Sequence, residues 1–285
     1  SAQVSSLYNS GSPINPMTLK PAPIASYLLG GDSSTGGDST NTLSVPNVAV
    51  PDASVFDFDG SGDYVDCTDI SYFSGADRFS LSTWFKVDSS DDGLANRDII
   101  SKGTTSAGTT SFLLRKQKNS NGNKVQIAFD EGVTNFYSTT QIQNDIWYHL
   151  VIVYKGYESN NSDRLDIYVD GVDVTASYSN TVPTTLVSSI QPVRIGRWAG
   201  SATDFNGEIT NTQIWTTSLG TTDVTTLYNN GVPLYTGTQP EAANLKSWYK
   251  LDQSANWDVS GSGYWDIPDA SGNGNDGISS GMTSA

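Results

Sequence analysis

Polar and apolar residues alternate with a period of two along most of this 285-residue chain. Residues 55–59 read Val-Phe-Asp-Phe-Asp, and residues 79–88 alternate in the same way. Successive side chains of an extended strand point to opposite sides, so this pattern predicts strands that are buried on one face. Packing two antiparallel sheets face to face buries many such strands at once, and we therefore expect an all-β sandwich.

Further short strands are predicted between polar turns rich in Asn and Gly. They cover residues 99–103, 111–117, 124–130, 135–140, 192–198 and 205–215. Residues 146–156 are apolar on both faces, which is typical of a central strand. Residues 164–176 predict a hairpin that turns at Asp170-Gly171. One helix is expected within 218–231, where Val224 and Leu227 are spaced for a helix face.

The charge of the chain excludes whole classes of partner. The chain has 15 Lys and Arg and 30 Asp and Glu, which gives a formal net charge of −15. Such a chain repels phosphate backbones, so we expect no nucleic-acid partner. No apolar run approaches the roughly 20 residues that a membrane span needs, and we expect no membrane insertion. Cys67 is the only cysteine, so we expect a small buried apolar residue and no internal disulfide.

The order of these segments carries a family resemblance. Phe-Ser-Leu-Ser-Thr-Trp-Phe at 79–85, Val-Arg-Ile-Gly-Arg-Trp at 193–198 and Phe-Asn-Gly-Glu-Ile at 205–209 stand among six such motifs. Their order and spacing resemble laminin-G-like modules of the concanavalin A-like jelly-roll superfamily, over residues 25–231. The resemblance implies a two-sheet antiparallel jelly roll with one short C-terminal-side helix. It also implies a calcium ion at a sheet edge and the binding of glycans or proteins.

A repeated motif suggests how the chain is organised. Leu-Tyr-Asn-x-Gly-x-Pro occurs at 7–13 and again at 227–233. We therefore expect a closing segment of a repeat unit at 1–22, a jelly-roll domain at 23–233 and a partial repeat at 234–285. The strand expected at 245–252 would pair either with its own domain or with a neighbouring subunit. The flanking segments resemble linkers in virion structural proteins of marine tailed phages.

One loop near the end has the composition of a calcium site. Side-chain oxygens alternate with glycine in Asp-Ala-Ser-Gly-Asn-Gly-Asn-Asp-Gly at 269–277, and calcium prefers six to eight oxygen ligands. The candidate ligands there are Asp269, Ser271, Asn273, Asn275 and Asp276. A plain Gly/Asn turn is the alternative interpretation.

Two further observations bear on the calcium prediction. Asp32 and Asp38 lie in the equivalent position of the first copy and are weaker candidates for a structural calcium ion. The resemblance implies the motif Gly-x-Ile-Asp-Glu from Gly207 onward, but Thr210 and Asn211 occupy the positions of its two carboxylates. This departure argues against a complete family site.

Other residues suit the binding of a sugar. Asp57 and Asp59 share one strand face, and aromatic side chains in or beside loops are expected to stack on sugar rings. The candidate aromatic ligands are Tyr137, Trp198, Trp257 and Trp265. Core packing is the alternative for any one of these rings.

Catalysis is not expected. The glucanases of this superfamily carry Glu-x-Asp-x-x-Glu on one strand, and none of the four glutamates here fits that pattern. His149, the only histidine, lies in the strand that is apolar on both faces, where a core role is expected. The sequence thus favours a non-enzymatic structural protein of a virion or another extracellular assembly that associates with itself or with other subunits. The alternative is a calcium-assisted carbohydrate-binding or adhesion module.

Overall fold

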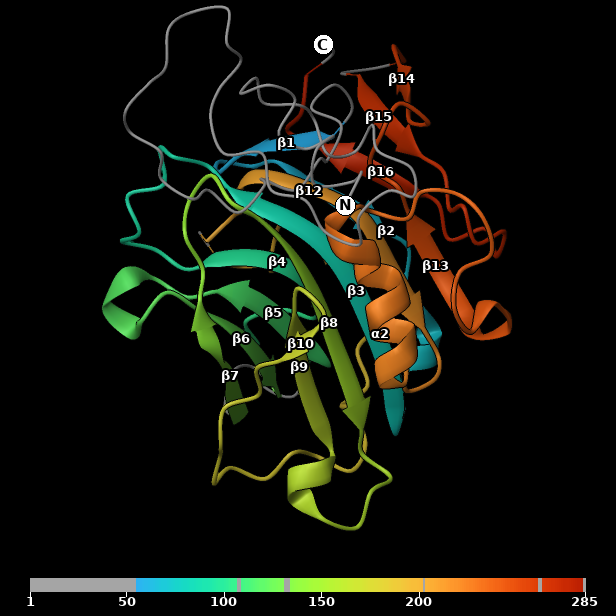
Figure 1. Ribbon diagram of the computed structural model, residues 1–285. Coiled ribbons are helices and arrows are strands. Elements are labelled where there is room, and N and C mark those ends of the chain that lie inside the picture. Colours follow the sequence, from blue (N-terminus) through green and yellow to red (C-terminus); the bar gives the residue numbers. More distant parts are fainter. Residues whose placement is uncertain (1–54, 107–108, 131–133, 202, 261–262, 284–285) are drawn as a thin grey trace, which may run out of the picture. The chain divides into compact units, whose positions relative to one another are not determined.

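The computed structural model describes residues 55–106, 109–130, 134–201, 203–260 and 263–283. Within them the chain folds into two antiparallel sheets packed face to face, with one α-helix (Figure 1). The predicted fold class is confirmed.

The first sheet has seven strands among the described residues, in the order β1-β12-β3-β8-β9-β10, and β13 also pairs with β12. Its strands are β1 (Phe56–Asp59), β3 (Arg78–Val87), β8 (Trp147–Lys155), β9 (Leu165–Val169), β10 (Val172–Asp173), β12 (Asn206–Trp215) and β13 (Leu245–Tyr249). Every residue from Trp147 to Tyr154 is buried, as the apolar pattern on both faces predicts. Asp170 and Gly171 have positive φ angles of 52° and 76°, so the expected hairpin turns between β9 and β10.

The second sheet has nine strands in the described part of the chain, in the order β14-β15-β16-β2-β11-β4-β5-β6-β7. Its strands are β2 (Tyr64–Cys67), β4 (Arg97–Lys102), β5 (Phe112–Lys116), β6 (Lys124–Phe129), β7 (Thr134–Gln141), β11 (Val193–Ile195), β14 (Asn256–Asp258), β15 (Tyr264–Ile267) and β16 (Gly277–Ser280). Short 3₁₀ turns stand at Ser71–Phe73, Asn119–Asn121, Asn161–Asp163, Asn229–Gly231 and Ala242–Asn244. The sequence did not predict β2, β14, β15 or β16.

The main core fills the space between the two sheets. Phe79, Leu81 and Phe85 of β3 point into it, whereas Trp84 of the same strand belongs to a separate cluster on the outer face of the first sheet. The side chains of residues 79–88 therefore alternate between the core and the outer face of the sheet, as predicted.

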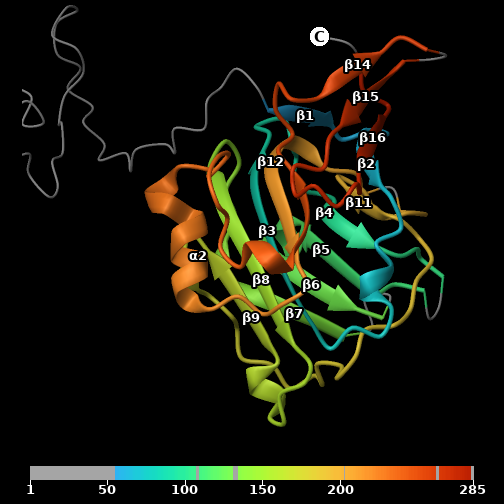
Figure 2. The same ribbon diagram turned by 90° about the vertical axis from the view of Figure 1, so that its right-hand side faces the viewer.

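The helix α2 (Thr221–Tyr228) covers the outer face of the first sheet (Figure 2). Its Val224 and Leu227 are buried in an apolar cluster with Trp215 of β12. The Asp223 carboxylate accepts a hydrogen bond from the Gly220 amide and begins the helix, and Asn229 ends it in the left-handed region at φ 46°. No helix of the described residues is long and apolar enough to cross a membrane.

The C-terminal segment contributes to both sheets. β13 pairs with Thr212–Trp215 of β12, and β1 pairs with Asn206–Ile209 of the same strand. β16 pairs with β2, so that Ile278 lies opposite Asp66. Of the two arrangements expected for the strand near residue 245, the structure has the one within the same chain.

Candidate binding pocket

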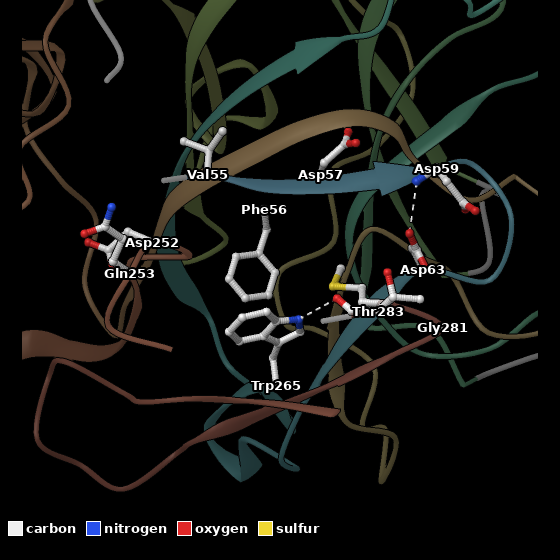
Figure 3. Close-up of a pocket in the computed structure, with 11 residues that line it drawn as sticks. Val55, Phe56, Asp57, Asp59, Asp63, Asp252, Gln253, Trp265, Gly281 and Thr283 are labelled. Carbon is white, nitrogen blue, oxygen red and sulfur yellow. Dashed lines mark hydrogen bonds between the residues drawn. The ribbon is translucent and has the colours of Figure 1, made fainter. Parts of the chain in front are cut away.

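A cavity of about 560 Å³ lies where β1 meets the C-terminal strands (Figure 3). Its volume falls within the range typical of pockets for small molecules. It is lined by Val55, Phe56, Asp57, Asp59, Asp63, Asp252, Gln253, Trp265, Gly281, Met282 and Thr283. The pocket therefore combines aromatic rings with carboxylates.

Strand β1 forms one side of the pocket. Phe58 is fully buried and Phe56 packs against the core, while Asp57 and Asp59 project from the opposite face of the strand. Among the described residues β1 has a paired strand on one side only, β12. Because residues from both faces of β1 line the pocket, the cavity wraps around the unpaired edge of this strand.

The aromatic wall comes from two distant parts of the chain. The rings of Phe56 and Trp265 lie 5.8 Å apart, centroid to centroid, at an angle of 71°. Trp257 on β14 also packs against Trp265, with 5.3 Å between the ring centroids. The Trp265 indole N–H donates to the carbonyl of Thr283 at 3.1 Å (Figure 3). These contacts hold the indole in one orientation at the side of the cavity.

The carboxylates of the pocket repel one another. Partial burial, followed by the negative charges of Asp88 and Asp59, raises the pKa of Asp57 above its ordinary value. Burial likewise raises the pKa of Asp63, and the nearby Asp59 and Asp57 add to the effect. The Asp63 Oδ2 atom accepts a hydrogen bond from the Asp59 amide at 3.1 Å, which favours the ionised form and offsets part of this rise.

None of the described residues that line this pocket is a lysine, arginine or histidine. The cation nearest to Asp57 in the pairing of the strands is Lys86, because Asp57 lies opposite Glu208 and Glu208 lies opposite Lys86. Lys86 and Glu208 form an ion pair at 2.6 Å. The positive charge beside the pocket is therefore already paired.

The structure brings three of the six predicted sugar-binding residues together at the pocket, namely Asp57, Asp59 and Trp265. Trp257 contacts Trp265 but does not line the cavity.

Tyr137 and Trp198 lie elsewhere on the second sheet. Tyr137 belongs to β7, at the end of the sheet opposite β14. The Trp198 ring lies under the guanidinium of Arg115, 5.3 Å from it, and its indole N–H donates to the hydroxyl of Thr110 at 3.3 Å.

Sequence reasoning missed the remaining lining residues. Phe56 was assigned to a buried strand face, Asp252 ends the strand expected at 245–252, and Gln253 belongs to no motif. Met282 and Thr283 reach the pocket only because β16 pairs with β2. Asp63 carried one signal, its position just beyond the Gly60-Ser61-Gly62 turn from Asp57 and Asp59.

The loop at 269–277 folds around the carboxylate of Asp269, which is 7 % exposed. Its Oδ1 atom accepts hydrogen bonds from the amides of Trp248 at 2.9 Å and Ser271 at 3.0 Å. Its Oδ2 atom accepts from the amide of Asn275 at 3.1 Å and from the side-chain amide of that residue at 3.3 Å. The carboxylate thus ties the loop to β13 through four donors of the protein itself.

The other candidate calcium ligands also make hydrogen bonds within this loop or to β13. Asp276 accepts a hydrogen bond from the Asp269 amide at 2.7 Å. The side-chain amide of Asn273 donates to Leu245 at 2.9 Å, and the Ser271 hydroxyl donates to Lys246 at 3.3 Å. No group of three or more His, Cys, Asp or Glu in the described part of the chain is placed to hold a metal ion.

The calcium prediction for residues 269–276 stays a prediction, because a count of carboxylates does not weigh oxygens from Ser and Asn. Asp32 and Asp38 lie outside the described residues.

His149 and Cys67 have core positions, as expected. Both are fully buried. The His149 Nε2 atom lies 2.8 Å from the Ser82 hydroxyl, and the ring stacks on Trp84 with 4.9 Å between centroids. Burial raises the pKa of the Cys67 thiol far above its ordinary value. Neither side chain reaches the solvent.

Comparison with known proteins supports the fold. Residues 59–225, more than half of the chain, match the model of the concanavalin A-like lectin/glucanase superfamily. A putative carbohydrate-binding protein from Bacteroides ovatus is similar in structure, with a TM-score of 0.51 and 19 % identity. That similarity covers 78 % of this chain and 58 % of the other, so the chain spans less than two thirds of that protein.

Two further solved structures are less similar. A heptameric SAP-like pentraxin from Limulus polyphemus has a TM-score of 0.43 and 16 % identity, over 60 % of this chain and 83 % of the pentraxin. A sialidase from Trypanosoma rangeli has a TM-score of 0.44 and 19 % identity, over 63 % of this chain and 27 % of the sialidase. No protein with curated annotation matches the sequence. On the strength of the match over residues 59–225, the chain belongs to the concanavalin A-like lectin/glucanase superfamily.

Proposed function

We propose that this chain is a non-enzymatic, extracellular carbohydrate-binding module, and that the pocket beside β1 holds the sugar. The observation that carries the proposal is that Asp57, Asp59 and Trp265 line the same cavity. Carboxylates accept hydrogen bonds from sugar hydroxyls, and an indole offers a flat apolar face to the C–H groups of a pyranose ring. The Bacteroides ovatus protein, similar in fold, is itself described as a putative carbohydrate-binding protein.

Two observations support the absence of catalysis. The nearest glutamate to the pocket along β12 is Glu208, and it is paired with Lys86 at 2.6 Å. His149 is fully buried behind Trp84 and cannot reach a ligand in the cavity. A pair of carboxylates does occur in glycosidases, but one of them must serve as a positioned acid above a scissile bond. We propose that Asp57 and Asp59 act as hydrogen-bond acceptors instead.

A role as an assembly subunit was the leading interpretation of the sequence, because the partial repeat at 234–285 offered a strand that could pair with a neighbouring subunit. In the structure this strand pairs with β12 of the same chain. This strand therefore does not require a neighbouring subunit, and we propose sugar binding as the function.

A glycan array tests the proposal. The full chain, labelled and applied with and without EDTA, is expected to retain at least one class of glycan. Trp265→Ala is expected to lower that signal about tenfold, which corresponds to about 1.4 kcal/mol of lost binding energy. Trp198→Ala is the matched control, because it removes an indole that does not line the pocket. Absence of binding to every glycan, or an equal loss in both variants, would contradict the proposal.

A further inference from the structure

The charge of the pocket restricts which sugars it can take. Of the described residues that line it, four are aspartates and none is a lysine, arginine or histidine. We infer that the pocket selects its saccharide by charge: it prefers an amino sugar whose ammonium group lies among Asp57, Asp59 and Asp63, accepts neutral sugars less well, and rejects carboxylated or sulfated ones. This inference rests on the proposed sugar-binding function and adds the class of ligand.

The cavity and its aromatic wall provide the room for a sugar ring, independently of the carboxylates. Phe56 and Trp265 form the wall on one face of β1, and Asp57 projects from the other face (Figure 3). A saccharide that lies across the unpaired edge of β1 contacts the rings with its apolar side and the carboxylates with its substituents. The arrangement therefore positions a charged substituent as well as a ring.

Asp63 supplies an acceptor without a partner. It is 7 % exposed, and its Oδ2 atom accepts the Asp59 amide, whereas no residue of the described chain donates to its Oδ1 atom. Gly281 lies over this oxygen, and a Cβ atom there would approach Oδ1 to 2.6 Å. The glycine thus leaves the Asp63 oxygen uncovered. This carboxylate oxygen is open to accept a hydrogen bond from a ligand N–H group.

The repulsion among the three carboxylates gives an ammonium group an advantage over a hydroxyl. Asp57 and Asp59 repel each other and both repel Asp63, which contributes to the raised pKa values of Asp57 and Asp63. A cation placed among them relieves this repulsion and forms charge-assisted hydrogen bonds, which are about twice as strong as neutral ones. The net charge of −15 adds a long-range repulsion against acidic glycans.

Titration calorimetry with oligosaccharides of equal length tests the inference. The ligands are fully deacetylated chitosan tetramer, its N-acetylated counterpart, and a tetramer of galacturonic acid, measured in EDTA at pH 6 with the full chain. The deacetylated tetramer is expected to bind about tenfold more tightly than the acetylated one, and the acidic tetramer is expected not to bind. The preference is expected to shrink in high salt, because salt screens the attraction.

Variants separate a local effect from the general charge of the chain. Asp57→Asn and Asp59→Asn keep the side-chain shape and are each expected to reduce the preference for the ammonium ligand severalfold. The control, Asp92→Asn, removes one exposed charge from a loop outside the pocket and is expected to leave the preference unchanged. An equal loss in the control would overturn the inference, because the attraction would then be nonspecific.

The experiments distinguish a failure of the charge selection from a failure of the proposed sugar-binding function. Equal affinity for all three tetramers, or tighter binding of the acidic one, overturns the charge selection and leaves the sugar-binding function standing. Binding of the acetylated tetramer alone also overturns the charge selection and leaves the sugar-binding function standing. If none of the three binds and the glycan array is also negative, both the function and the inference fail.

Discussion

The ring of Phe56 contacts the indole of Trp265 edge-on, with 5.8 Å between centroids and 71° between the ring planes. Phe56 belongs to β1 of the first sheet and Trp265 to β15 of the second. The family match ends at residue 225, so one side of the pocket comes from the shared jelly roll or its border and the other from the C-terminal extension. The candidate site exists only because these two segments meet.

A double-mutant cycle measures this contact. Phe56→Leu and Trp265→Leu each replace an aromatic ring by an aliphatic side chain. Their effects on the free energy of unfolding in urea are expected to be non-additive by about 1 kcal/mol, because edge-on aromatic pairs contribute about 0.5–1.5 kcal/mol beyond their buried area. Pairing Phe56→Leu with Trp257→Leu provides the control, since no ring contact joins Phe56 to Trp257. Full additivity for Phe56 and Trp265 would show that the extension does not pack on β1.

A second prediction concerns Asp269. Asp269→Ala removes the acceptor of four hydrogen bonds and leaves the buried amide of Trp248 without a partner. The free energy of unfolding is expected to fall by about 3 kcal/mol. Because the donors belong to the protein itself, the loss is expected to be the same in EDTA and in calcium.

The control for this variant is Asp266→Ala, which removes an exposed carboxylate of β15 and should change stability by less than about 0.5 kcal/mol. If calcium stabilises the wild type and not Asp269→Ala, the calcium prediction for this loop gains support and the purely structural account of Asp269 is wrong.

The third prediction concerns the pairing of β13 within one chain. Trp248 is 7 % exposed, and its indole N–H donates to the side-chain oxygen of Asn211 at 2.7 Å. Trp248→Ala is expected to lower the free energy of unfolding by about 3–5 kcal/mol. The unfolding midpoints of the wild type and the variant are expected to be independent of protein concentration, because the strand pairs in cis. A midpoint that rises with concentration would show that β13 pairs with a neighbouring chain.

Periodicity predicted the strands of the jelly roll because each of them buries one face or both. The interval 146–156 and the hairpin at Asp170-Gly171 are examples in which local pattern and final structure agree. β2 and β14–β16 were missed because they are short and partly exposed, so their pattern is weak. They become strands through partners far away in the sequence, such as Asp66 opposite Ile278.

Local alternation also predicted part of the candidate site. The alternation on β1 placed Asp57 and Asp59 on one face, and the structure has them there. No local pattern could bring Asp252 or Thr283 to them, since that requires the long-range pairing of β13 and β16.

The sequence pattern did not predict the buried ion pairs either. Lys116 and Asp91 are fully buried and lie 3.0 Å apart, yet each looks like a surface residue in the sequence. Alternation reports which side of a strand faces inward, and it does not reveal a charge whose partner comes from another loop.

The last prediction concerns His149. Burial lowers the pKa of its imidazole to about 3, because desolvation penalises the charged form. The unfolded chain takes up this proton near pH 6.5, whereas the folded protein excludes it until about pH 3. The contribution of His149 to stability is therefore complete above pH 6.5 and is lost as the pH falls, by up to about 5 kcal/mol.

His149 is the only histidine in the chain, so its ring signals in an NMR spectrum are unambiguous. They are expected to show no titration between pH 8 and pH 5. His149→Gln, which preserves a polar partner for Ser82 but cannot titrate, is the matched variant. The stability advantage of the wild type over this variant is expected to shrink as the pH falls from 7 to 5. An imidazole that titrates near pH 6.5 in the folded protein would place His149 in contact with water and contradict its full burial.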